Sequence, residues 1–129
     1  MCLTSICPLL QHLRHVLDHF QLLLDALETS HPDDSVELRE EHLELSYDVR
    51  KRNTPVENNR ESARKAYETV IARLEALAGT LKSGSAPPLA LPVLLAADTP
   101  HHVTVKTSLG RELWFCALHA IHHFSMVSH

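Results

Sequence analysis

The chain contains three long stretches in which apolar residues recur at helical spacing. The first runs from about Pro8 to Glu28, the second from Thr54 to Leu81, and the third from about Leu109 to the C-terminus. Apolar side chains three or four positions apart gather on one face of an α-helix. The pattern therefore predicts three amphipathic helices and a mainly α protein.

Local signals place the ends of these helices. Pro8 suits the first turn of the first helix, and the polar run from Ser30 to Asp34 predicts its end. Thr54, followed by Pro55, has the pattern of an N-cap before the second helix. Ser108 is the predicted N-cap of the last helix.

The segments between the helices give weaker patterns. Val36 to Asn53 is heavily charged, and its leucines form no helical stripe, so we expect a long connection that holds at most one short helix. The segments Leu89 to Ala96 and His102 to Lys106 are rich in Val, Leu and Thr around a turn. They predict a small β-hairpin before the last helix.

Composition narrows the class of protein. The 129 residues suit one domain spanning 1–129, and the net charge of −4, with no basic patch beyond Arg50–Arg52, gives no reason to expect a nucleic-acid partner. No apolar run approaches the roughly 20 residues that span a bilayer, and the start does not resemble a signal peptide. Three cysteines without paired spacing indicate reduced thiols. We expect a cytoplasmic protein with no membrane partner.

Histidine placement changes this picture. The chain has 11 histidines, and two pairs, His15 with His19 and His119 with His123, have four-residue spacing on the first and last predicted helices. Residues four apart lie one turn above each other on the same face. Two neutral imidazoles so placed can bind one transition metal, and a third from a neighbouring helix completes a site. The pattern predicts a metal site between these helices.

Other side chains that can bind metals lie on the same face of the last predicted helix as His119 and His123. Glu112 and Cys116 lie within about 60° of His119 on a helical wheel, whereas His122 lies about 60° to the other side. Cys116 is either a fourth ligand or a buried inert thiol. Glu112 is either a base or ligand, or a first-turn acid that complements the helix dipole.

A structural explanation competes with the metal site. A histidine in a helical core often serves as a hydrogen-bonded core residue, and one His-x-x-x-His pair alone is a weak signal. Arg50, Arg52 and Glu57 either cover the mouth of a site or form a solvated charged loop. The histidines predicted to lie in loops or at the chain end are expected to be exposed: His31, His42, His101, His102 and His129.

Four segments resemble the DinB-like (YfiT-like) metalloenzyme superfamily. They are Arg14–His19, Tyr47–Glu57, Leu109–Leu113 and His119–Phe124, and they occur in the expected order over most of the chain. The last segment is the most specific of the four.

The resemblance implies a fold, a cofactor and a chemistry. It implies an up-down-down-up helical bundle that dimerises and holds zinc or nickel through three histidines. Carried over to this chain, the ligands are His15 from the first helix and the pair His119 and His123 from the last. His19 then becomes a surplus or supporting residue. Relatives include thiol-dependent S-transferases that use low-molecular-weight thiols on small-molecule substrates.

The chain departs from the family pattern in two ways. It has three long predicted helices, so a fourth must come from the Val36 to Tyr47 region, from beyond the end or from a partner subunit. The chain also ends six residues after His123, so the resemblance implies a domain truncated at its C-terminus.

Three functions remain open from the sequence. The first is a metal-dependent enzyme, a thiol S-transferase or a hydrolase. The second is a non-catalytic metal-stabilised helical dimer or degenerate relative. The third is a plain helical protein whose histidines hydrogen-bond in the core.

Overall fold

The computed structural model describes residues 8–29, 42–49, 54–84, 89–98 and 100–128. These residues form a mainly helical protein with a small three-stranded sheet. The elements, in chain order, are α1 (Pro8–Thr29), β1 (Leu43–Ser46), a 3₁₀ turn η1 (Pro55–Glu57), α2 (Arg60–Ser83), β2 (Pro92–Ala97), β3 (Val103–Ser108) and α3 (Leu109–Val127).

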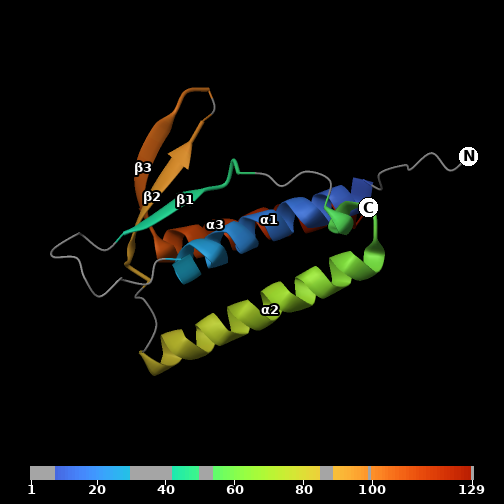
Figure 1. Ribbon diagram of the computed structural model, residues 1–129, viewed down its shortest axis with the longest axis horizontal. Helices are drawn as coiled ribbons and strands as arrows, with labels where there is room; N and C mark the ends of the chain where they lie inside the picture. The colour runs from blue at the N-terminus through green and yellow to red at the C-terminus, as the bar shows by residue number, and fades with distance from the viewer. Residues whose placement is uncertain (1–7, 30–41, 50–53, 85–88, 99, 129) are drawn as a thin grey trace, which may run out of the picture.

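Helix α1 is the centre of the helical layer. It packs against both α2 and α3, whereas α2 and α3 have little or no contact with each other in the described residues. In Figure 1, α1 and α2 run in the same direction, and α3 runs back against them. The three amphipathic helices of the sequence are confirmed, but the four-helix up-down-down-up arrangement remains a proposal.

The sheet is larger than the predicted hairpin. β2 and β3 pair antiparallel, with Val93 opposite Thr107 and Leu95 opposite Val105, as the alternation predicts. β1 adds a third strand, parallel to β2, with Leu43 opposite Val93. The expectation of a long connection with at most one short helix was therefore wrong at 43–46, which form a strand. Leu43 and Leu45 alternate with Glu44 at the two-residue period of a half-buried strand. The structure does not describe residues 30–41.

The start of α2 also differs from the sequence-based prediction. Thr54 makes no side-chain cap hydrogen bond and precedes the 3₁₀ turn. The cap is Asn59, whose Oδ1 accepts hydrogen bonds from the backbone N–H groups of Glu61 and Ser62. Ser108 caps α3 as expected, with its hydroxyl accepting from the Arg111 N–H.

Two apolar clusters hold the layers together. One joins the sheet to α1 and α3 and is built on six buried residues: Leu23, Leu43, Leu45, Val93, Leu109 and Cys116. The other joins α1 to α2 through Leu17, Leu24 and Val70. Burying side chains of this size contributes about 1.5–3 kcal/mol each, so these clusters fix how α1 meets its neighbours. None of the described helices is both long enough and apolar enough to cross a membrane.

Candidate metal centre

Three imidazoles from two helices converge between α1 and α3. His15 comes from α1, and His119 and His123 come from α3; one ring nitrogen of each lies within 4.8 Å of the others. The ring of His15 is 4.7 Å from that of His119 and 4.8 Å from that of His123, measured between centroids. The residues predicted as ligands therefore lie together, although His15 is more than a hundred positions from the other two in the chain.

The spacing within the α3 pair fits chelation of one ion. The Nε2 atoms of His119 and His123 lie 3.1 Å apart. Two ligands at about 2.0–2.1 Å from a tetrahedral ion are separated by about 3.3 Å. Nδ1 of His119 is buried and has no hydrogen-bond partner among the described residues. This imidazole thus has a hydrogen-bonding group that the described protein leaves unsatisfied.

The electrostatic environment keeps the α3 pair neutral. The pKa of His119 is lowered to about 4, mainly by burial and further by the neighbouring rings of His19, His15, His123 and His122. Burial also lowers the pKa of His123, assisted by His12 and other histidines. Neutral imidazole is the form that binds metal, because the lone pair is then available. The donor set therefore fits a divalent transition metal such as zinc or nickel.

His19 lies behind the three imidazoles and supports them. It is buried, and its Nδ1 donates a hydrogen bond to the backbone carbonyl of His15, 3.0 Å away. Its ring lies 4.0 Å from that of His119 and stacks on Tyr47 at 4.8 Å. His19 therefore fixes the position of a proposed ligand without belonging to the group of three.

Tyr47 and Glu112 form a buried polar network beside His19. Glu112 is fully buried, and its carboxylate accepts hydrogen bonds from Tyr47 Oη at 2.7 Å, Thr107 Oγ1 at 2.9 Å and Arg111 at 2.9 Å. The carboxylate thus has partners from β3, α3 and the segment after β1. Glu112 is neither a ligand in the histidine group nor only a first-turn acid, because burial and three donors give it a structural role.

Cys116 belongs to the same network. Its Sγ lies 3.6 Å from Tyr47 Oη. Because the tyrosine hydroxyl donates its hydrogen bond to Glu112, the thiol of Cys116 is the donor to the tyrosine oxygen. Burial raises the pKa of Cys116 to about 11, and the pKa of Tyr47 is raised mainly by the same cause. A protonated buried thiol matches the inert alternative and is a poor metal ligand.

The remaining sequence candidates lie apart from the group. His122 is exposed on α3, as its angle on the helical wheel indicates, and His42, His101 and His102 are exposed as well. Glu57 forms an ion pair with Arg14 of α1 and is largely covered, so it is not part of a solvated loop. Four residues of the earlier expectations lie outside the described ones: His31, Arg50, Arg52 and His129.

Sequence reasoning missed two contacts of the site. Tyr47 begins one of the four segments that resemble the DinB-like superfamily, but nothing in the sequence indicates that its ring stacks on that of His19. His12 precedes His15 by one turn, and only the packing of α1 on α3 brings it to His123. A third histidine on the same edge of the first helix was the one available signal.

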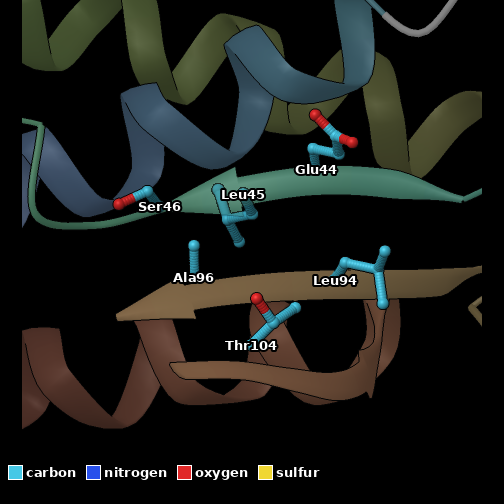
Figure 2. Close-up of a pocket in the computed structure, with 6 residues that line it drawn as sticks. All are labelled: Glu44, Leu45, Ser46, Leu94, Ala96 and Thr104. Carbon is cyan, nitrogen blue, oxygen red and sulfur yellow. The ribbon is translucent and has the colours of Figure 1, made fainter. Parts of the chain in front are cut away.

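A hollow on the sheet is lined by residues other than the three histidines. It has a volume of about 420 Å³ and lies on the sheet, lined by residues of all three strands: Glu44, Leu45, Ser46, Leu94, Ala96 and Thr104. Figure 2 shows these six residues, none of which is a proposed ligand. The histidines gather instead at the junction of α1 and α3, away from this hollow.

Comparison with known proteins gives one partial relative. FK506-binding protein 5 of Rhizopus delemar is 36% identical over 83 residues, which are 64% of this chain and 21% of that protein. The chain thus matches about a fifth of the length of this fungal protein. No family model matches the chain, and no solved structure matches it.

Proposed function

We propose that the chain binds one divalent transition metal through His15, His119 and His123. We further propose that it is a metal-dependent enzyme resembling the DinB-like thiol S-transferases, with hydrolysis as the related alternative. The observation that carries the proposal is the convergence of three imidazole nitrogens within 4.8 Å from two separate helices. The low pKa of His119, about 4, adds support because that ring is neutral at physiological pH.

Three protein ligands suit catalysis better than a closed structural site. Structural zinc sites use four protein ligands, whereas catalytic sites use three and leave one position for water or substrate. A divalent metal in such a site lowers the pKa of a bound water or thiol and supplies a nucleophile near neutral pH. The protein's own part is to hold three neutral imidazoles in place, with His19 and Tyr47 packed behind them. A low-molecular-weight thiol and a small-molecule electrophile are the proposed reactants.

The fungal relative adds no substrate to this proposal. Its name describes binding of FK506, and the match spans 21% of its length. The shared stretch indicates that the fungal protein contains a segment related to this chain. FK506 binding is not part of what we propose for this chain.

A second function, a non-catalytic metal-stabilised homodimer, is favoured by the outer face of α3. Trp114, Leu118, Ile121 and Phe124 are 42–65% exposed there, on the side away from α1. From Leu113 to Ser128 the helix has no Asp, Glu, Lys or Arg. An uncharged apolar stripe suits a second copy of the same helix better than a charged partner.

Metal analysis of the purified protein tests the first proposal. Protein prepared without chelator and loaded with zinc or nickel should contain one metal per chain by elemental analysis. The H119A/H123A double variant should lose it, because two of three ligands are removed. An H101A variant is the matched control, since His101 is an exposed histidine in the β2–β3 turn. Wild-type protein without stoichiometric metal after loading would refute the site.

Turnover separates the enzyme from the non-catalytic dimer. The loaded wild-type protein should transfer thiols from a panel, including glutathione and cysteine, to an electrophile such as monochlorobimane faster than the double variant. If substitution of the histidines lowers the melting temperature and the loaded protein shows no turnover with any thiol, the non-catalytic function is supported instead.

A further inference from the structure

One histidine outside the proposed ligand set touches it directly. Nδ1 of His12 lies 2.9 Å from Nδ1 of His123, and the two ring centroids are 5.1 Å apart. His12 lies on α1, one turn before His15, so the contact joins the two helices that supply the site. The contact is part-buried, which shields it from competition by solvent.

The contact constrains which nitrogen of His123 carries a proton. A neutral imidazole has one N–H donor and one acceptor nitrogen. The two Nδ1 atoms therefore form a hydrogen bond only if one ring donates and the other accepts. The remaining nitrogen of His123, Nε2, lies on the side of His119, 3.1 Å from its Nε2. For Nε2 of His123 to offer its lone pair to a metal, Nδ1 of His123 must be the donor.

We propose that His12 is a positioning residue for the metal ligand His123. It accepts the Nδ1–H of His123 and so holds the tautomer and the ring orientation that present Nε2 to the metal. This inference rests on the proposed metal site. Metal-ligating histidines commonly donate their second N–H to a carboxylate, a carbonyl or water, and loss of that partner weakens metal binding about 10- to 100-fold. Here the acceptor is a second imidazole.

The two other nearby histidines do not fill this role. His19 uses its Nδ1 for the carbonyl of His15, four residues earlier on its own helix. His122 is exposed, and its ring lies 5.5 Å from that of His123 at a steep angle. His12 is thus the histidine whose ring nitrogen meets Nδ1 of His123.

Zinc affinity of His12 variants tests the inference. His12→Phe removes the acceptor and keeps a ring, whereas His12→Asn keeps an acceptor oxygen close to the position of Nδ1. Competition with a chromophoric chelator should show zinc binding about 10- to 100-fold weaker in His12→Phe. His12→Asn should bind zinc close to wild type, and the control His101→Asn should be unchanged. Thermal unfolding of the metal-free forms should show that each variant is folded.

Each outcome distinguishes this inference from the metal site itself. If wild-type protein binds no zinc, the proposed site fails. If wild type binds zinc and His12→Phe binds it equally well, the positioning role is overturned and the site stands. If His12→Asn is as weak as His12→Phe, acceptance of the hydrogen bond is not what His12 contributes, and the inference is overturned. The visible spectrum of cobalt-substituted His12→Asn should match wild type, whereas a changed spectrum would mark His12 as a direct ligand.

Discussion

Glu112 is the buried charge that links the sheet to α3. No part of its side chain is exposed, and three donors surround its carboxylate: Tyr47, Thr107 and Arg111. A buried carboxylate is stable only when its oxygens are hydrogen-bonded. Because Tyr47 stacks on His19, the same network also holds the side chains that pack against the proposed metal ligands.

Loss of the Glu112 carboxylate should destabilise the fold. Glu112→Ala leaves the part-buried hydroxyl of Tyr47 without its acceptor and opens a cavity, so we expect the free energy of unfolding to fall by about 3 kcal/mol. Glu112→Gln keeps the volume and one acceptor oxygen and should cost about 1–2 kcal/mol. Urea unfolding of the metal-free protein measures both.

A surface acid gives the matched control for Glu112. Glu61 forms an exposed pair with Arg64, with the Glu61 side chain 55% exposed. Such pairs contribute about 1 kcal/mol or less, so Glu61→Ala should change stability little. Equal effects of Glu112→Ala and Glu61→Ala would contradict a structural role for the buried network.

Residues of the candidate site could be predicted from the sequence where their spacing along one helix places them on the same face. The pair His119 and His123 follows from four-residue spacing, and His15 from the same rule and the family resemblance. The contacts of His12 and Tyr47 could not be predicted, because they depend on how α1 packs on α3 and on a residue beyond the end of a strand. The periodicity of residues along one helix or strand carries no information about such contacts between distant elements.

Elements were predicted well where a pattern extends over many residues. The three helices each span five turns or more, so their apolar stripes are clear. Strand β1 has four residues and two buried leucines within a charged segment. It forms by pairing with β2, whose partner residues lie fifty positions later in the chain. The start of α2 was misplaced because Thr54 precedes a 3₁₀ turn, Pro55–Glu57, that ends before Asn59 caps the helix.

The two possible caps of α2 should differ in energy. Asn59→Ala removes the acceptor for two backbone N–H groups, so we expect a loss of about 1 kcal/mol in the free energy of unfolding. Thr54→Ala should cost less, because the Thr54 hydroxyl is buried without a hydrogen-bond partner among the described residues. Asn59→Asp, which keeps the acceptor, should stay near wild type. A larger loss for Thr54→Ala than for Asn59→Ala in urea unfolding would reverse the assignment.

At the scale of the whole molecule, α1 packs against α2, α3 and β1, whereas α3 packs against α1 and β3. The α3 face toward α1 holds His119 and His123, and the opposite face holds Trp114, Leu118, Ile121 and Phe124. At about 200 Å² for a fully exposed large side chain, these four expose roughly 400 Å² per copy. Two copies packed through this face would bury somewhat less than the roughly 1,000 Å² of a small specific interface before neighbouring residues are added. The area suits a weak homodimer.

A charge placed in this face should prevent the proposed dimer without disturbing the proposed metal site. Ile121 is 65% exposed and lies on the side of α3 away from α1. If the proposed dimer forms, Ile121→Glu should convert it to a monomer, because the substitution buries an unpaired carboxylate at the contact. Sedimentation velocity over a range of protein concentrations measures the change, and the zinc content should remain that of wild type. Ile71→Glu is the matched control, because Ile71 is 50% exposed on α2 and lies outside this face.

If wild-type protein is monomeric at every concentration, or if Ile71→Glu dissociates the dimer as completely as Ile121→Glu, the α3 face is not the contact. If Ile121→Glu also abolishes zinc binding, the two faces of α3 are coupled, and dimerisation is part of the site.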